Sequence, residues 1–195
     1  MAPLFLLGCY AVFFLLAMVL PSVRVRRATG LNPVVLASGD DADGFVGRMF
    51  KLLLAVLPLY LGALSLGWIE AIGPIGLPAP KAAALVGGGL IAASLLWVLL
   101  AQWQMGRSWR IGIDKAHPGA LVSSGLFRFS RNPIFLGMLA LLAGMFLAMP
   151  DAVTVLALGL GFALISVQVR LEEAHLAARH GAAYDQYRAQ VRRWL

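Results

Sequence analysis

Apolar residues form five long runs along the chain, separated by shorter polar stretches. The runs cover residues 4–23, 52–69, 82–103, 133–149 and 152–169. A helix needs about 20 apolar residues to cross a hydrocarbon core that is roughly 30 Å thick. The apolar positions in each run are continuous, without the alternation typical of strands, and a helix satisfies its own backbone polar groups in lipid. The pattern predicts an all-α integral membrane protein with about five transmembrane helices.

Composition supports the same class of protein. The chain has 195 residues, of which 61% are hydrophobic and 13% are charged, and its mean hydropathy is +0.84. A soluble domain of this length cannot bury that much apolar surface. We therefore expect residues 1–195 to form a single membrane domain, with residues 104–132 and 170–195 outside the hydrocarbon.

The last two apolar runs are joined only by Met149, Pro150 and Asp151, which predicts a tight helical hairpin. Seventeen positions separate Pro133 from Pro150, and seventeen separate Asp151 from Gln168. The two arms therefore return to the same depth. In the first arm, Gly137 and Gly144 are seven residues apart on one helix face, a spacing that favours close packing against another helix.

The basic residues indicate the topology. Groups of five follow the first, third and fifth runs, whereas the connections after the second and fourth runs hold only Lys81. The three groups are Arg24, Arg26, Arg27, Arg48 and Lys51; Arg107, Arg110, Lys115, Arg128 and Arg131; and Arg170, Arg179, Arg188, Arg192 and Arg193. The positive-inside rule makes this side cytoplasmic and leaves the N-terminus outside. Basic residues that flank apolar runs favour lipid headgroups as partners, so we expect no binding of nucleic acid.

We expect no metal site. The acidic stretch from Gly39 to Gly44 lacks the remaining ligands of a calcium loop, which favours a solvated loop without a part in cofactor binding. His175 and His180 are five residues apart on a helix expected to be exposed, and His117 has no second ligand nearby. The only cysteine, Cys9, lies inside the first apolar run.

Two polar segments flank the hairpin on the predicted cytoplasmic side. Asn132 and Pro133 suit the N-cap and first positions of a helix, and Arg131 precedes them. This is either an anion site at a helix N-terminus or an ordinary cap with Arg131 at the headgroups. The fifth run is expected to continue as one helix until Gly181, followed by a C-terminal cytoplasmic helix. That places Glu172 and Glu173 near the membrane surface at the depth of Arg131, as a structural ion network or as functional groups.

The two segments together resemble the isoprenylcysteine carboxyl methyltransferase and phospholipid methyltransferase family. The resemblance covers about Gly106 to Trp194. The matching positions are Gly125, Phe127, Arg128, Arg131, Pro133, Gly137, Glu172, Glu173, Leu176, Gly181, Tyr184, Tyr187 and Val191. It implies a cytoplasmic pocket over the hairpin for S-adenosylmethionine, and an amphiphilic substrate that enters from the bilayer.

The resemblance also implies roles for individual residues. The catalytic group would be Arg131, Glu172 and Glu173, with Glu173 as the base if the methyl acceptor is an amine or a thiol. The cofactor pocket would comprise Gly125, Leu126, Arg131, Asn132, Pro133, Phe135, Glu172, Tyr184 and Tyr187. The chain departs from the family pattern at three positions: Asn132 replaces a histidine, Phe135 replaces a tyrosine and Leu126 replaces a proline. These departures leave the substrate open between an isoprenylcysteine-like carboxylate, a lipid amine and a thiol.

Two other functions are weighed against this one. A membrane NADPH-dependent sterol or lipid reductase has a similar turn, although no glycine-rich dinucleotide loop is present in the sequence. A non-catalytic membrane protein would keep the fold without turnover. Binding of S-adenosylmethionine, of NADPH or of neither separates the three.

Overall fold

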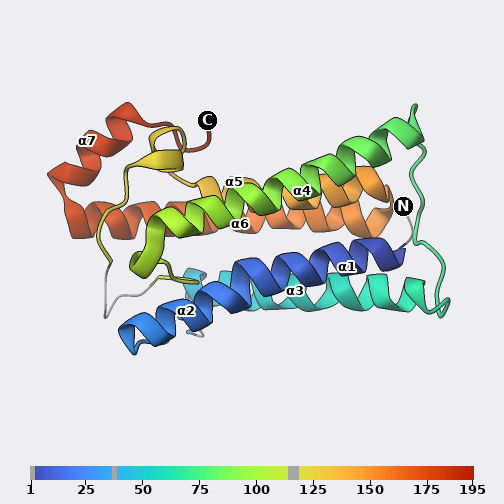
Figure 1. The fold of residues 1–195 in the computed structure, drawn as a ribbon, viewed down its shortest axis with the longest axis horizontal. Helices are drawn as coiled ribbons and strands as arrows, with labels where there is room; N and C mark the ends of the chain where they lie inside the picture. Colours follow the sequence, from blue (N-terminus) through green and yellow to red (C-terminus); the bar gives the residue numbers. More distant parts are fainter. Residues whose placement is uncertain (1–2, 37–38, 114–118) are drawn as a thin grey trace.

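The computed structural model describes residues 3–36, 39–113 and 119–195, which form a bundle of antiparallel helices (Figure 1). The α-helices are α1 (Pro3–Phe14), α2 (Leu20–Thr29), α3 (Ala42–Ser65), α4 (Pro80–Met105), α5 (Pro133–Ala148), α6 (Ala152–His180) and α7 (Ala182–Gln190). A π-helical turn, η1 (Leu15–Val19), joins α1 to α2, and two 3-10 turns are η2 (Gly106–Ser108) and η3 (Gly125–Arg128). The described residues contain no β-strand longer than an isolated bridge, so the predicted all-α membrane fold is confirmed.

Four helical segments are long and apolar enough to cross a membrane: Pro3–Thr29, Ala42–Ser65, Pro80–Ser108 and Ala152–His180. The fifth, α5, has 16 residues and a length of about 24 Å at 1.5 Å per residue. By the same rule the 29 residues of α6 extend over about 43 Å, well beyond a hydrocarbon core of roughly 30 Å. The charged residues of α6 follow its apolar part, from Arg170 onward, so we expect residues 170–180 to lie outside the membrane-spanning segment.

The third helix in chain order, α3, begins earlier than the predicted run 52–69. It starts at Ala42 because the Asp41 side chain accepts a hydrogen bond from the Gly44 N–H at 2.8 Å and caps the helix. Asp43 lies in the first turn, where the helix dipole favours a negative charge. The expectation of a solvated loop from Gly39 to Gly44 is therefore wrong for its second half, which belongs to the helix.

The hairpin of α5 and α6 forms as predicted. Asp151 caps α6 in a capping box with Thr154, and its other carboxylate oxygen accepts a hydrogen bond from Tyr60 Oη at 2.7 Å. α6 ends at Gly181, as predicted, with φ at +50°.

Glycines allow α4 and α5 to pack closely. A Cβ at Gly137 would collide with Val98 Cγ2, and one at Gly144 would lie 2.8 Å from the Gly87 carbonyl oxygen. The packing predicted for Gly137 and Gly144 is confirmed, and α4 is the partner helix. The α4–α5–α6 layer then covers α1 and α3, which lie side by side (Figure 1).

Two prolines inside apolar helices are compensated by side chains from neighbouring helices. Proline has no N–H, so the carbonyl four residues earlier loses its regular donor. For Pro58 this carbonyl belongs to Leu54, and it accepts a hydrogen bond from Tyr10 Oη at 2.7 Å. Behind Pro21, at the π-helical turn, the Ala17 carbonyl accepts one from Gln102 Nε2 at 2.6 Å. Both contacts join helices within the apolar region, where a lost backbone hydrogen bond is costly.

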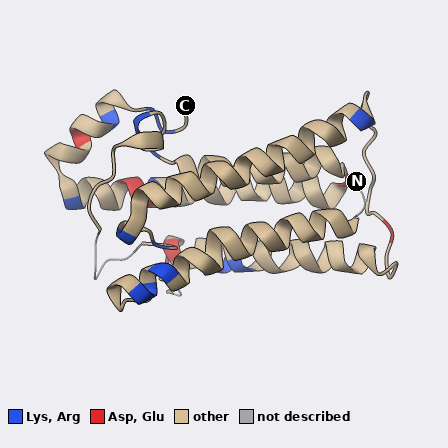
Figure 2. Ribbon diagram, viewed as in Figure 1, with Lys and Arg blue, Asp and Glu red and all other residues tan. Residues whose placement is uncertain are grey.

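Lys and Arg gather at the end of the bundle that carries α7, as Figure 2 shows. At the opposite end lie the first turn of α4, with Lys81, and the α5–α6 connection. The N-terminus lies at the end opposite α7, whereas the chain after α7 turns back, so that the C-terminus lies nearer the middle of the bundle (Figure 1). We refer to the end with α7 as the basic end.

Candidate functional site

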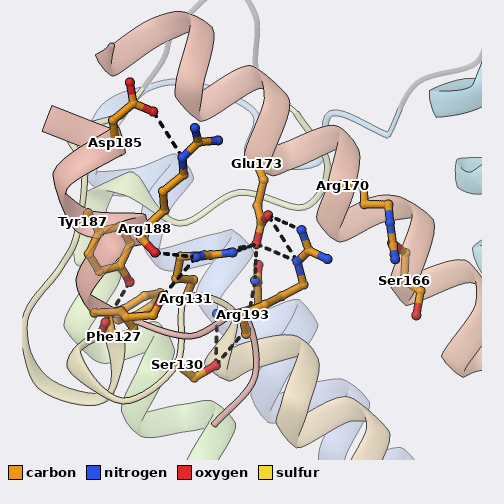
Figure 3. Close-up of polar contacts among 12 residues, drawn as sticks. Phe127, Ser130, Arg131, Ser166, Arg170, Glu173, Asp185, Tyr187, Arg188 and Arg193 are labelled. Carbon is orange, nitrogen blue, oxygen red and sulfur yellow. Dashed lines mark hydrogen bonds and ion pairs between the residues drawn. The ribbon is translucent and has the colours of Figure 1, made fainter. Parts of the chain in front are cut away.

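The hairpin brings Arg131 and Glu173 together at the basic end (Figure 3). Arg131 Nε and Nη2 donate to Glu173 Oε1 at 3.2 and 3.1 Å. Arg193 Nη2 donates to Glu173 Oε2 at 2.8 Å, and Asn132 Nδ2 donates to Glu173 Oε1 at 3.2 Å. The predicted meeting of Arg131 with the glutamate pair is confirmed for Glu173. We call Arg131, Asn132, Glu173 and Arg193 the arginine–glutamate network.

Hydrogen bonds from the same network join the C-terminal segment to the start of α5. Arg131 Nη1 donates to the carbonyls of Arg188 and Val191 at 3.0 and 2.9 Å. Asn132 Nδ2 also donates to the Arg193 carbonyl. Each guanidinium nitrogen of Arg131 thus has an acceptor within the chain, and the Arg131 side chain is only 12% exposed. Arg131 is held in place by the fold itself.

The start of α5 has the predicted residues in a different arrangement. Asn132 occupies the N-cap position and Pro133 the first turn, but the Asn132 side chain caps no helical N–H. It points to Glu173 and Arg193 instead. The expected capping contact is therefore wrong, because the orientation that directs Nδ2 to these two acceptors leaves Oδ1 without a helical N–H to accept from.

The environment of Glu173 stabilises its ionised form. Burial alone would raise the pKa of Glu173, but hydrogen bonds from Arg193 and Arg131 outweigh it and hold the pKa below its ordinary value. An ionised, fully paired carboxylate is a weak proton acceptor. This environment suits a structural ion pair better than a base.

Four other predicted residues lie at the two contacts of η3. Tyr187 Oη donates to the Phe127 carbonyl at 2.7 Å, and Tyr184 contacts Tyr187 edge-on with ring centroids 6.1 Å apart. Gly125 has φ at +62° and lies against the Gln104 side chain, whose Oε1 accepts from the Leu126 N–H at 2.8 Å. Tyr184 and Tyr187 thus lie where α7 meets η3, whereas Gly125 and Leu126 lie where η3 meets α4.

A cavity of about 130 Å³ lies inside the basic end of the bundle, and we call it the central cavity. Its lining residues come from η1, α3, α4, α5, α6 and the segments that follow α2 and α4. They are Met18, Leu36, Phe50, Leu54, Gln102, Met105, Trp109, Arg110, Ile111, Gly112, Ile134, Phe135, Met138, Gln168 and Glu172. Of the residues predicted for the site, only Phe135 and Glu172 line this cavity. Consecutive helical residues point about 100° apart, which directs Glu172 into the cavity and Glu173 into the network.

Glu172 is the acidic residue of the cavity wall. Its carboxylate accepts a hydrogen bond from Gln168 Nε2 at 3.1 Å. Burial raises the pKa of Glu172 to about 7, the Gln168 contact opposes the rise, and the negative charge of Asp43 adds to it. A carboxyl group that titrates near neutral pH in an apolar cavity is suited to accept a proton. Asp43, assigned above to a segment without a part in the site, is close enough to influence this group.

Two extended segments cover the central cavity. The Val35 N–H donates to the Ile111 carbonyl at 2.9 Å, and the Ile111 N–H donates to the Pro33 carbonyl at 2.8 Å. Trp109, in the second segment, is 3% exposed, whereas Trp103 at the end of α4 is 77% exposed. Trp109 therefore belongs to the cavity wall, whereas Trp103 does not.

Sequence reasoning missed two polar residues of the site. Gln168 left a signal, because it is an amide within an apolar run, where polar side chains are costly. Arg193 left none: its contact with Glu173 depends on the chain folding back after α7. The described residues contain no group of three or more His, Cys, Asp or Glu placed to hold a metal ion, and His117 lies outside the described residues.

These features define a multi-pass helical membrane protein with a buried, partly acidic cavity at one end. Residues 82–183 match the model of the phospholipid methyltransferase family, and the chain belongs to this family of membrane methyltransferases. The match runs from the start of α4 into α7 and includes both glutamates and Arg131. No curated protein and no solved structure matched the chain.

Proposed function

We propose that the protein transfers a methyl group from S-adenosylmethionine to an amphiphilic substrate, and that the central cavity holds the reacting groups. The observation that carries the proposal is Glu172, a carboxyl with a pKa near 7 on the wall of an otherwise largely apolar cavity. Most residues that line the cavity belong to the part of the chain that matches the methyltransferase family. The others come from η1, α3 and the segment after α2.

The residues present fit S-adenosylmethionine. A second cavity of about 140 Å³ adjoins the first and shares Met105, Arg110, Gly112 and Glu172 with it. The shared carboxylate suits a sulfonium or ammonium group, and the shared Arg110 guanidinium suits a carboxylate. Phe135 adds an aromatic face. When bound, S-adenosylmethionine supplies an electrophilic methyl group.

The chain's own residues would then align the acceptor, exclude water and handle a proton. Methyl transfer is an in-line displacement, for which alignment and a dry site matter most. The paired segments over the cavity and the apolar residues of α3 and α5 serve these needs. If the acceptor is a protonated amine or a thiol, the Glu172 carboxylate takes its proton; an isoprenylcysteine-like carboxylate needs no base.

We propose supporting roles for the other predicted residues. Arg131, Asn132 and Glu173 position α5 and the C-terminal segment next to the cavity. Tyr184 and Tyr187 hold η3 against α7, and Gly125 and Leu126 hold it against α4. Pro133 starts the helix that carries Phe135. The basic end is assigned to the cytoplasm by the positive-inside rule, which leaves the N-terminus outside.

Methyl-labelled S-adenosylmethionine tests the function directly. Purified protein is incubated with the labelled compound and a membrane extract, and we expect label in the lipid fraction. Chromatography of that fraction then separates methylated amines, esters and thioethers. Binding of NADPH with no transfer of label would favour the reductase, and binding of neither compound would favour a non-catalytic protein.

A further inference from the structure

Gln102 is a polar residue in the apolar part of α4, and it is 6% exposed. Its Nε2 donates to the Ala17 carbonyl at 2.6 Å. Its Oε1 has no hydrogen-bond partner within residues 3–36, 39–113 and 119–195. A buried carbonyl oxygen without a donor is unfavourable and rare in folded proteins, so it calls for an explanation.

The orientation of this amide is fixed by chemistry. The Ala17 carbonyl can only accept, so the amide nitrogen of Gln102 must face it. That carbonyl needs a donor because Pro21 removes its regular one. A rotation of the amide that gave Oε1 another environment would leave the Ala17 carbonyl unbonded in lipid. Pro21 therefore forces Gln102 to present a free acceptor.

Gln102 lines two cavities. It lines the central cavity, and it also lines a groove of about 350 Å³ between α2 and α4. The other groove residues are apolar, apart from Arg24 and Arg107, and include Leu16, Leu20, Leu99 and the exposed Trp103. This combination suits an amphiphile, with its tail along the apolar wall and an anionic part near the arginines.

We propose that Gln102 determines specificity for the methyl acceptor, with Oε1 accepting a hydrogen bond from an N–H or O–H group of the acceptor's headgroup. This inference rests on the proposed function for the identity of the ligand. Glu172 lines the same central cavity as Gln102, so a donor group that Gln102 holds in this cavity shares the space with the proposed base. A headgroup without a donor leaves Oε1 unpaired and binds less tightly.

The test compares two lipids that differ in one headgroup property. Phosphatidylethanolamine and phosphatidylcholine share phosphate and tails, but only the first has N–H donors. Native mass spectrometry measures how much of each lipid the purified protein retains from an equimolar mixture. We expect at least about threefold more phosphatidylethanolamine. Equal retention by the unmodified protein would overturn the proposal.

The variants separate the two roles of Gln102. Pro21→Ala restores an N–H at residue 21, the regular donor for the Ala17 carbonyl, so Gln102 is no longer needed there. Pro21→Ala should keep the lipid preference, and Pro21→Ala with Gln102→Met should lose it while keeping its Tm within a few degrees of that of Pro21→Ala. A preference that survives in the double variant would contradict the proposal.

Tyr10→Phe is the matched control. It removes the equivalent contact behind Pro58, to the Leu54 carbonyl, but Tyr10 does not line the central cavity. It should lower Tm without changing the lipid preference. If the preference depends on Gln102 but no lipid is methylated, the proposed function fails while the contact stands. If lipids are methylated without a Gln102-dependent preference, only this inference fails.

Discussion

Glu172 and Glu173 are neighbours in sequence but lie in different environments. Glu173 pairs with Arg131 and Arg193, which keeps its pKa low. Glu172 lines an apolar cavity, which raises its pKa. Sequence reasoning favoured Glu173 as the base. Both residues match the family motif, and nothing in the sequence shows which of them faces the site. The helix phase that separates them depends on the packing of α6 against α5 and α3.

Glu173→Gln should reduce the stability of the fold more than it reduces the rate of methyl transfer. The change leaves the guanidinium groups of Arg131 and Arg193 without an ionised partner in a largely buried site, at a cost of about 1–3 kcal/mol. Thermal unfolding in detergent measures the loss. Limited proteolysis should cut the segment after Gln190 faster, because that segment is fastened through Arg131. An unchanged Tm and cleavage rate would show that the network contributes nothing to folding.

The raised pKa of Glu172 predicts a pH dependence of ligand binding. S-adenosylhomocysteine carries an ammonium group, so its affinity should increase between pH 5.5 and 8 as Glu172 ionises, with a midpoint near 7. Asp43→Asn removes a nearby negative charge, lowers the pKa of Glu172 and should move the midpoint to lower pH. Calorimetric titration across this range measures both.

Asp40→Asn is the control for that experiment. Asp40 pairs with Arg48 at the surface and does not contribute to the raised pKa of Glu172. It should leave the midpoint in place. A midpoint that moves equally in both variants would mean that the overall charge of the segment, rather than Asp43, controls Glu172.

At the scale of elements, the hairpin and the two compensated prolines organise the bundle. The hairpin follows from sequence alone, because two apolar runs separated by three residues have no other arrangement in a membrane. The pairing of Tyr10 with Leu54 and of Gln102 with Ala17 does not, because it depends on which helices are neighbours. The start of α3 could not be predicted from the apolar pattern either, because its Asp41 cap precedes the apolar run by several residues.

Tyr10→Phe and Pro58→Ala should show coupled effects on stability. Tyr10→Phe alone removes the donor to the Leu54 carbonyl and should cost about 0.5–1.5 kcal/mol. In a Pro58→Ala background the backbone N–H at residue 58 replaces that donor, so the same change should cost much less. A double-mutant cycle in detergent measures the coupling, and purely additive effects would contradict this role for Tyr10.

At the scale of the whole molecule, the basic residues set one end of the bundle apart. The family match covers α4 to the start of α7, while η1 and α3 complete the cavity walls with Met18, Phe50 and Leu54. Sequence patterns located the matched half of the site. They did not locate the other half, because its apolar residues resemble those of any transmembrane helix.

Reporter fusions test the proposed orientation. A fusion at Leu195 should report the cytoplasm, and one in the connection between Glu70 and Pro80 should report the exterior, because α7, which precedes Leu195, and this connection lie at opposite ends of the bundle. The same compartment for both fusions would contradict the bundle. Inverted compartments would contradict the positive-inside assignment alone.

Calorimetric titration of S-adenosylhomocysteine into the purified protein and its Glu172→Gln variant tests the central claim most directly. The protein should bind the compound at pH 7.5, and Glu172→Gln should weaken binding at least about tenfold, or roughly 1.4 kcal/mol, with an unchanged Tm. Glu70→Gln, the same change at the opposite end of the bundle, should bind as the unmodified protein does. Equal affinity in all three proteins would place the ligand outside the central cavity, and absence of binding to the unmodified protein would contradict the proposed function.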